Sequence, residues 1–398
     1  GQWHNVGRLR DVEETLLHPL KQLGYRTCHV GKSHLHPHGS GRDLRDAIPF
    51  MNALGWDDVL ECTGPWSTRT TTSILTDWMK TEGIFDLFME DYARRKQAGV
   101  KNLWPSPLPD GKHPDDFIAR TAVNYIHDSD PSAPLYLFVG FGGPHEPWDS
   151  PVRFDTYQPE DMPPPLPRDG VPDWLSNPAR DFQERTTSHN PSVTENDWAR
   201  IRTLYSGRVE HVDSCLGEVL KAWYQKRGQD TWVVFWADHG EMLGDKAHSG
   251  KCVFYESSVR VPAIIRPPQG CSSPIVSNAL VGLTDLTATV LDAAEYTSLS
   301  QNIFGHSLLG VFENSDSVGS PYVVSEIGHS TMIFDGIWKL VVDSRDETLQ
   351  FFNLQADPTE SLNLAGKPDL SEVEKHLRAS LRHFLLRTQY RQHREKNG

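Results

Sequence analysis

The chain is poor in the features that mark membrane, disulfide-stabilised and nucleic-acid-binding proteins. Its longest apolar runs, residues 135–141 and 232–237, are far too short to cross a bilayer. Basic residues number 39 against 53 acidic ones, and the resulting net charge of −14 repels phosphate backbones. The five cysteines form no close pairs and no metal-ligand spacing, which argues against a disulfide framework; they are Cys28, Cys62, Cys215, Cys252 and Cys271. We therefore expect no membrane span and no nucleic-acid partner.

The remaining composition is that of a large folded protein. The chain has 398 residues, of which 37% are hydrophobic and 10% aromatic, enough for a sizeable core. It opens on Gly1 rather than on Met and carries no charged-then-apolar leader, so we expect a processed chain or a fragment. The compartment (cytoplasm, or periplasm and exterior) and the oligomeric state stay open.

Short apolar segments alternate with helical periodicity over the first three quarters of the chain, which is typical of an α/β domain. We expect strands at 27–30, 135–141 and 232–237, and helices at 16–23, 117–127 and 194–226, the longest one ending at Gly228. Thr15 is the expected cap of the first helix. A proline-rich polar stretch at 158–192 predicts a long surface loop.

The pattern changes after about residue 315. Segments 322–326, 331–342 and 348–353 predict successive antiparallel strands, with turns at Asp335-Gly336 and at 344–346. A last amphipathic helix begins near Ser371. We therefore expect a catalytic α/β domain over residues 1–315 and a small α+β subdomain over residues 316–398.

Titratable side chains follow three of the expected strands directly. Lys32 and His34 follow the first, His145 follows the second, and Asp238 and His239 follow the third. Ligands of open α/β sheets gather at the carboxyl ends of the strands, so these loops are expected to share one crevice. A cation, imidazoles and a carboxylate suit a metal together with acid–base chemistry on an anionic substrate.

Each of these signals also has a purely structural interpretation. Asp238-His239-Gly240 can be a capped turn, His145 a hydrogen-bonded turn residue and Lys32 a solvated surface charge. The run His34-Leu-His36-Pro-His38 could be a local zinc clip, but its i, i+2 spacing fits no common closed site. Only their joint placement after strands favours a functional site.

With these residues in place, the chain resembles the sulfatase family over nearly its whole length. Two segments carry most of the likeness: residues 23–35, which include Gly31-Lys32-Ser33-His34, and Asp238-His-Gly-Glu-Met-Leu-Gly-Asp245. Further blocks follow in the family's order and spacing, at residues 141–147, 250–262, 283–291 and 352–364. The resemblance implies an alkaline-phosphatase-like fold, a mixed sheet between helices with a small C-terminal sheet. It also implies hydrolysis of sulfate esters by a formylglycine nucleophile with a divalent metal, Ca²⁺ or else Mg²⁺.

The resemblance also implies a role for each candidate residue. Lys32 would hold the nucleophile and sulfate oxygens, and His34 would help to expel sulfate from the covalent intermediate. His145 and Lys251 would bind sulfate and assist the leaving oxygen, while Asp238 and His239 would ligate the metal. A histidine at 239, where many members have Asn, leaves the identity of the metal open. We expect all six residues to converge on one pocket.

Two parts of the family pattern are not found where they are expected. These are a strand ending in paired acids, and the Cys-x-Pro-x-Arg motif whose Cys or Ser becomes formylglycine. Cys62-Thr-Gly-Pro-Trp has its proline one position late, and Ser176-Asn-Pro-Ala-Arg180 follows the His145 motif instead of preceding Lys32. We therefore expect a truncated copy of a sulfatase, with the formylglycine position upstream of residue 1, and no activity in the chain as given.

Three functions compete on this evidence. The first is a sulfate-ester hydrolase, whose substrate would be a small-molecule or carbohydrate sulfate ester. The second is a non-catalytic sulfatase-like protein that binds a sulfated ligand or a partner, and the third is a phosphodiester or phosphonate monoester hydrolase of the same superfamily. Trp66 and Trp148 could stack on a sugar or aryl ring, or simply pack beneath a loop.

Overall fold

The computed structural model describes residues 7–9, 15–167, 193–269, 274–296, 305–313 and 319–394. The chain divides into two compact units, the first made of Gly1–Pro165 and Asn190–Asp230, the second of Leu166–His189 and Thr231–Gly398. The fold is mixed α/β, as the sequence predicts: a parallel sheet with helices, and a C-terminal antiparallel sheet with a helix. The boundary expected near residue 315 falls within the second unit and stays a prediction.

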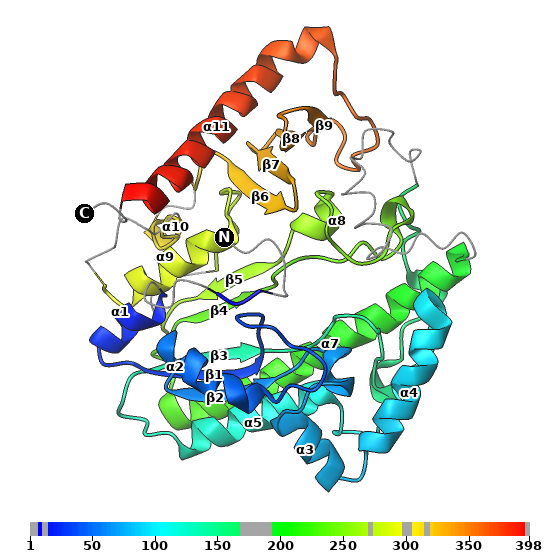
Figure 1. Ribbon diagram of the computed structural model, residues 1–398, viewed down its shortest axis with the longest axis vertical. Helices are drawn as coiled ribbons and strands as arrows, with labels where there is room; N and C mark the ends of the chain where they lie inside the picture. The colour runs from blue at the N-terminus through cyan, green and yellow to red at the C-terminus, as the bar shows by residue number, and fades with distance from the viewer. Residues whose placement is uncertain are drawn as a thin grey trace. The chain divides into compact units, whose positions relative to one another are not determined.

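Three parallel strands form the centre of the first unit (Figure 1). They are β1 (Arg26–Lys32), β2 (Asp58–Cys62) and β3 (Leu135–Gly140), in the order β2-β1-β3. Lys32 pairs with Cys62, and Gly31 pairs with Gly140, so all three strands end at the same edge. The sequence predicts β1 and β3; β2 was missed, because two of its five residues are acidic and hide the apolar pattern of a buried strand.

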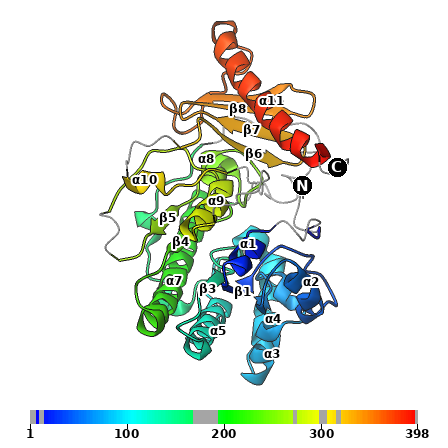
Figure 2. The same cartoon turned by 90° about the vertical axis from the view of Figure 1, so that its left-hand side faces the viewer.

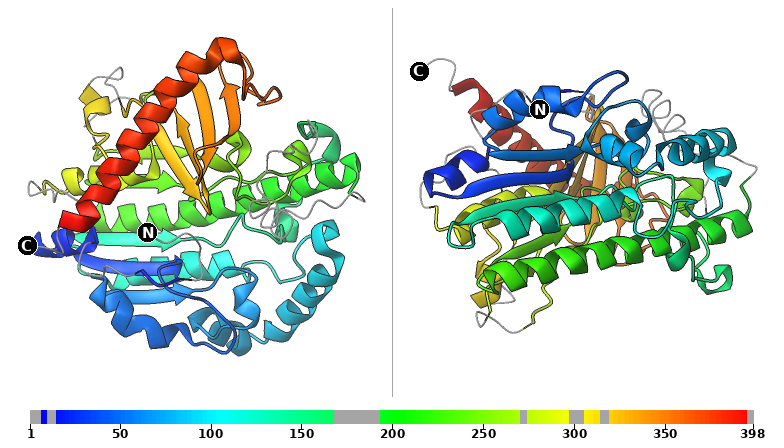
Figure 3. Two further views of the ribbon diagram at one scale, coloured as in Figure 1. Left: turned by 45° about the horizontal axis from the view of Figure 1, so that its top comes forward. Right: turned by 90° about the horizontal axis from the view of Figure 1, so that it is seen from below.

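Helices cover both faces of this sheet. One face holds α1 (Leu17–Gln22) and α2 (Ile48–Ala53), packed on β2 and β3 around Trp56. The other face holds the larger core, to which four helices contribute: α3 (Ile74–Thr81), α4 (Phe85–Ala98), α5 (Pro114–Asp128) and α7 (Glu195–Arg227). Helices α5 and α7 lie side by side beneath the strands (Figure 3).

The longest helix, α7, begins and ends where its sequence predicts. The Thr194 hydroxyl accepts a hydrogen bond from the Asp197 backbone N–H at 3.2 Å, and the Asp197 carboxylate accepts one from the Thr194 N–H at 2.8 Å. This reciprocal cap satisfies two backbone donors that the first turn leaves unpaired. Gly228 ends the helix with φ of 76°, a conformation that glycine adopts without steric cost.

The second unit contains two antiparallel sheets. Strands β4 (Val233–Trp236) and β5 (Ala263–Arg266) form a two-stranded ribbon. Strands β6 (Val323–Ile327), β7 (Ser330–Phe334), β8 (Trp338–Asp343) and β9 (Thr348–Asn353) form a meander. The turns after β7 and β8 lie where the sequence predicts them, whereas the turn between β6 and β7 was not predicted. Helix α11 (Ser371–Arg394) packs on this meander through Leu377 and Leu381 (Figure 2). Shorter helices are α8 (Glu256–Val259), α9 (Leu283–Ala293) and α10 (Gly310–Glu313).

The connections contain short 3₁₀ turns at Leu44–Ala47, Ser67–Arg69, Gly99–Lys101, Val152–Phe154, Pro159–Asp161, Asp245–Ala247 and Pro368–Leu370. Most of the expected proline-rich loop, including Ser176, lies outside the described residues, and so does Cys271. None of the helices in the described ranges combines the length and the apolar character needed to cross a membrane.

Candidate active site

The carboxyl edge of the parallel sheet places two of the expected site segments next to each other. Lys32 is the last residue of β1, inside the strand rather than in the following loop. His145 lies in the turn that follows β3, where its backbone N–H donates to the Gly142 carbonyl at 3.3 Å. Because β1 and β3 are adjacent and in register up to Gly31 and Gly140, both segments leave the sheet at the same edge. The two segments thus leave the sheet as expected, and a shared crevice between them stays a prediction.

The Lys32 side chain runs over the backbone of the loop that follows β2. A Cβ placed on Gly64 would lie 3.2 Å from Cε and 3.7 Å from Nζ of Lys32. A larger residue at 64 would therefore press on the lysine stem, so glycine is what lets the two segments approach this closely. Gly64 is a positioning residue, and no sequence motif indicates this role.

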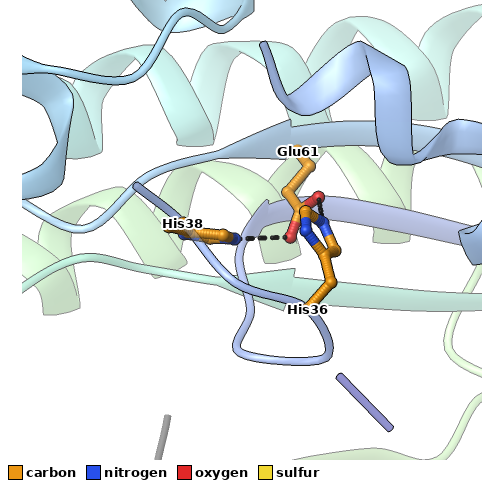
Figure 4. Close-up of side chains that lie close together, drawn as sticks. All are labelled: His36, His38 and Glu61. Atoms are coloured by element: carbon orange, nitrogen blue, oxygen red, sulfur yellow. Dashed lines mark hydrogen bonds and ion pairs between the residues drawn. The ribbon is translucent and has the colours of Figure 1, made fainter. Parts of the chain in front are cut away.

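The segment after Lys32 folds onto one buried carboxylate, Glu61 of β2. Ser33 donates its hydroxyl to Oε1 of Glu61 at 2.6 Å, and the Nε2 atoms of His36 and His38 lie 2.7 and 3.2 Å from the two carboxylate oxygens. The two imidazoles approach this carboxylate from two sides (Figure 4). The ring of His34 lies 5.6 Å from that of His38. The sequence suggests at most a clip made of the histidines alone and gives no sign of Glu61, because no strand is predicted at 58–62.

Burial and hydrogen bonding act in opposite directions on Glu61. Burial by itself raises the pKa of the carboxyl group, because it disfavours the charged form. Hydrogen bonds from His36, His38 and Ser33 outweigh burial and leave the pKa of Glu61 well below its ordinary value. The group is therefore an ionised carboxylate at neutral pH, only 5% exposed.

The orientation of His145 is set by its neighbour. Its Nδ1 lies 2.6 Å from the carbonyl oxygen of Glu146 and 3.0 Å from that residue's carboxylate. A carbonyl oxygen can only accept a hydrogen bond, so Nδ1 carries the proton. A bound substrate would therefore meet the Nε2 atom of His145.

The loop that carries His145 is held in place by a buried ion pair that was not predicted from the sequence. Asp115, near the start of α5, accepts hydrogen bonds from the backbone N–H groups of Gly142 at 2.7 Å and Gly143 at 3.2 Å. Arg208 of α7 donates to the same carboxylate at 2.5 Å, and both side chains are fully buried. The Arg208 guanidinium outweighs burial and holds the pKa of Asp115 well below its ordinary value. Acids in a first helical turn are common, so the sequence carries no signal for this role.

Within the second unit, Asp238 and His239 follow β4 as predicted. The Asp238 carboxylate is 68% exposed, and its Oδ2 lies 3.6 Å from Nε2 of His239. Nδ1 of His239 lies 2.8 Å from the Gly240 carbonyl, which fixes the proton on Nδ1 and turns the Nε2 lone pair toward the Asp238 side. Orientation of an imidazole by a carbonyl on its other nitrogen is typical of metal-ligating histidines.

Lys251 belongs to the same loop system as Asp238. The backbone N–H of Met242 donates to the Gly250 carbonyl at 2.8 Å, and the Glu241 carboxylate accepts a hydrogen bond from the Gly250 N–H. Gly240 is required here, because a Cβ at that position would lie 2.1 Å from the Ser257 carbonyl oxygen. Hydrogen bonds thus hold both ends of the loop in place. Lys251 is half-buried and directly follows Gly250, the residue held at the second end.

The six expected site residues therefore fall into two groups, each on one unit: Lys32, His34 and His145 on the first, and Asp238, His239 and Lys251 on the second. Their convergence on one pocket stays a prediction. For the two tryptophans the structure favours the packing role. Trp148 is only 3% exposed, and Trp66 packs edge-on against the buried ring of Tyr92, with ring centroids 5.4 Å apart.

The pair Asp238 and His239 fits a divalent cation but does not complete a site for one. It offers one carboxylate and one oriented imidazole. Ca²⁺ takes six to eight ligands, almost all oxygen, whereas an imidazole nitrogen suits the transition metals better. Two donors are thus in place for a metal, and the nitrogen donor weakens the expectation of calcium.

Comparison with known proteins decides the family. The family model described as "Sulfatase" matches residues 2–296. The chain belongs to the sulfatase family. A second model, "N-sulphoglucosamine sulphohydrolase, C-terminal", matches residues 244–387 of this sulfatase chain.

Curated relatives carry several sulfatase names. The chain is 27% identical over 393 residues to an arylsulfatase of Clostridium perfringens, covering 93% of this chain and 78% of the relative. It is 26% identical to a choline-sulfatase of Rhizobium meliloti, covering 92% and 70%. Arylsulfatase K of Mus musculus is 26% identical over 65% of this chain, and the match spans only about half of that relative, 52%.

Solved structures confirm the fold class. A phosphonate monoester hydrolase of Agrobacterium radiobacter matches with a TM-score of 0.75 at 20% identity, over 94% of this chain and 80% of that one. A structure described as a complex with its substrate D-glucosamine-2-N,6-O-disulfate matches with a TM-score of 0.70 at 18% identity, over 97% and 84%. Identities this low support the fold and leave the choice of substrate open.

Proposed function

We propose that this chain carries the substrate-binding and leaving-group machinery of a hydrolase for sulfate esters. The observation that carries the proposal is the placement of Lys32 at the end of β1, and of His34 and His145 after the adjacent, in-register parallel strands β1 and β3 of a sulfatase-family fold. The substrate would be a small-molecule or carbohydrate sulfate ester. We further propose that Lys251, Asp238 and His239 act on the same substrate.

The proposed roles follow from the charge of the reacting group. A sulfate ester is an anion whose leaving oxygen gains negative charge in the transition state, so cations and a proton donor there lower the barrier. Lys32 and Lys251 supply positive charge. His145 presents its Nε2, since its Nδ1 is held by Glu146, and Nε2 donates a proton to the leaving oxygen only when the ring enters the reaction as the doubly protonated imidazolium. Asp238 and His239 would hold a divalent metal (Ca²⁺, with Mg²⁺ as the alternative), which supplies further stabilisation of negative charge when bound.

Sulfate binding tests the proposal directly. Titration of the purified chain with inorganic sulfate, in the presence of Ca²⁺, should show binding that Lys32→Ala and Lys251→Ala each weaken about tenfold or more, because each removes a charge-assisted contact. Lys80→Ala and Lys375→Ala, at exposed positions of the two units, are the matched controls and should bind like the parent. Equal sulfate affinity in the parent and all four variants would contradict the assignment of Lys32 and Lys251 to a sulfate-binding site.

A turnover assay tests whether the chain also contains a nucleophile besides the assigned binding residues. No residue of the 398 is assigned as the formylglycine position, so we expect the chain to release no aryl alcohol from an aryl sulfate, since binding groups alone form no covalent intermediate. Steady release that is abolished by Ser176→Ala would overturn this expectation and make Ser176 the nucleophile.

A phosphonate monoester hydrolase is the second candidate, because the solved structure with a TM-score of 0.75 carries that name. A relative from Trinickia caryophylli, 26% identical, is described as a multifunctional alkaline phosphatase superfamily protein. Competition distinguishes the two: displacement of bound sulfate by an aryl sulfate at lower concentration than by an aryl phosphonate supports sulfate esters. The reverse order favours phosphonates.

A further inference from the structure

We propose that His36, His38 and Glu61 form a binding site for a transition-metal dication of the zinc class. This site uses none of the residues that the sulfatase resemblance assigns, and it does not depend on the proposed function. One ligand atom of each of the three side chains lies within 4.8 Å of the other two. All three belong to the first unit and come from two segments, the loop after β1 and strand β2.

The geometry brings the metal-binding atoms to one point. Both imidazoles direct Nε2 at the Glu61 carboxylate, at 2.7 Å for His36 and 3.2 Å for His38 (Figure 4). With metal–ligand bonds of about 2.1 Å in a tetrahedral arrangement, ligand atoms stand roughly 3.4 Å apart. Nε2 of His36, at 2.7 Å, would therefore have to move away from the carboxylate by about 0.7 Å, and Nε2 of His38, at 3.2 Å, by about 0.2 Å to admit an ion.

The surroundings are those of a built site rather than of a chance surface cluster. The side chains of His36, His38 and Glu61 are 7%, 3% and 2% exposed. Ser33 donates a hydrogen bond to the Glu61 carboxylate, the kind of outer contact that orients a metal ligand. The hydrogen bonds present do not account for the whole cluster, because Nδ1 of His38 is buried without a partner among the described residues.

Charge and donor type select the class of ion. One carboxylate and two neutral imidazoles carry a net charge of −1, which a dication complements. Two nitrogens and one oxygen match the three-ligand sites of Zn²⁺, in which a water or another group takes the fourth position. Ca²⁺ and Mg²⁺ prefer oxygen donors and are disfavoured here.

The other two clusters of possible ligands in the described part of the chain lack this character. In the cluster of His113, Asp115 and His211, the Arg208 guanidinium already occupies the place of a cation, 2.5 Å from Asp115 and 3.0 Å from His211. In the cluster of Asp116, His211 and Cys215, burial raises the pKa of the Cys215 thiol, which opposes the thiolate form that binds metals.

Metal at this point would tie the segment that contains His34 to strand β2. His34 lies between Ser33 and His36, both already attached to Glu61, and its ring is 5.6 Å from that of His38. The site would therefore act on the loop as a clip, with Glu61 as its fixed half.

Metal content of the purified chain tests the proposal. After removal of metal with a chelator and dialysis against Zn²⁺, the parent chain should hold one equivalent more than His38→Gln or Glu61→Gln, whose Zn²⁺ affinity at this point should fall more than about 100-fold. His127→Gln, at an exposed position of α5, is the matched control and should keep the parent content. Each comparison is repeated with Asp238→Ala, so that metal held at Asp238 and His239 is counted separately.

A second measurement needs no variant and covers the case in which a substitution unfolds the loop. Co²⁺ bound by His36, His38 and Glu61 should add the visible absorption of a four-coordinate site. Equal metal content in parent and variants, or no visible absorption when Co²⁺ is added to the parent chain, would overturn the proposal.

Discussion

The two groups of candidate site residues are supported in different ways. In the first unit, the segments with Lys32 and His145 leave adjacent parallel strands, and the His145 loop rests on the fully buried pair of Asp115 and Arg208. In the second unit, the Asp238 segment follows a two-stranded ribbon and is held by backbone hydrogen bonds of Gly240 and Met242, with its carboxylate 68% exposed. In the first unit, buried charged side chains position the loop, whereas in the second unit the Asp238 carboxylate stays accessible to solvent. Substitutions beneath the first group should therefore cost stability, and substitutions within the second should cost binding.

The largest effect is expected from Arg208→Met. It leaves Asp115 and Asp149 buried without their cation, which typically costs about 3–5 kcal/mol of unfolding free energy. Denaturant unfolding measures the loss, and hydrogen exchange should show it in α5, α7 and the Gly142–Gly143 amides. Arg45→Met, which removes exposed ion pairs, is the control. Equal stability of the two variants would show that the buried pair does not support the loop.

Lys339→Met is the counterpart in the second unit. The Lys339 ammonium is fully buried and lies 2.5 Å from Glu256 and 2.7 Å from Glu360. Its loss leaves buried carboxylates behind, and because Glu256 is partly exposed we expect a smaller cost, about 3 kcal/mol. Exchange should rise in β6–β9 and not in α5 or α7. A rise in both sets would contradict the separation of the two units in stability.

The buried imidazole of His29 should make the stability of the first unit depend on pH. Burial lowers its pKa to about 4, and Glu61, His36 and His38 act on it more weakly. The unfolded chain, with a histidine pKa of about 6.5, binds more protons between these values, so stability falls as the pH drops from about 6.5 toward 4. The full shift corresponds to about 3 kcal/mol.

His29→Leu tests this origin. The ring is packed between Trp56 and Phe138, and neither of its nitrogens has a hydrogen-bond partner among the described residues. Denaturant unfolding at pH 7 and pH 5 should show a smaller difference for the variant than for the parent. The same pH dependence in both would assign the effect to other groups, for example the Glu61 cluster.

Gly143→Ala should cost about 1–3 kcal/mol, because the added Cβ would lie 2.4 Å from Nη2 of Arg208 and one of the two must move. Gly217→Ala is the matched control: this glycine lies in α7 with nothing within 4 Å of the new Cβ, so the variant should gain about 0.5–1 kcal/mol. Denaturant unfolding measures both. A neutral Gly143→Ala would show that the loop beneath His145 is adaptable.

The smallest change in stability is expected from Asp238→Ala. Its carboxylate accepts one hydrogen bond from the His239 backbone N–H, at 3.1 Å, a contact worth about 1 kcal/mol as a turn cap. Any Ca²⁺ or Mg²⁺ that the parent chain holds at Asp238 should by contrast be lost in the variant, as metal analysis of both proteins measures. Full metal content in the variant would assign Asp238 the turn-capping role alone and leave the accessible second group without its function.

The sequence by itself determined the elements whose pattern is local. The long helix from Glu195 to Arg227 has its own cap and its own apolar stripe, and the C-terminal meander has its own turn residues, so both were predicted with nearly the observed bounds. The polar residues after β1, β3 and β4 were likewise predicted, because each apolar strand and the charged loop that follows it are consecutive in the sequence.

Only the tertiary structure decided which distant residues serve those loops. Glu61 meets His36 and His38 because β2 pairs with β1, and Asp115 meets Gly142 because α5 and α7 close beneath β3. The sequence around a single acidic residue does not show which residue will pair with it. Whether a buried carboxylate is stable depends on hydrogen-bond donors that the folded structure brings to it. The strands and helices can therefore be predicted from neighbouring residues in the sequence. The buried ion pairs and hydrogen bonds that position the candidate site form only when the chain folds and brings distant residues together.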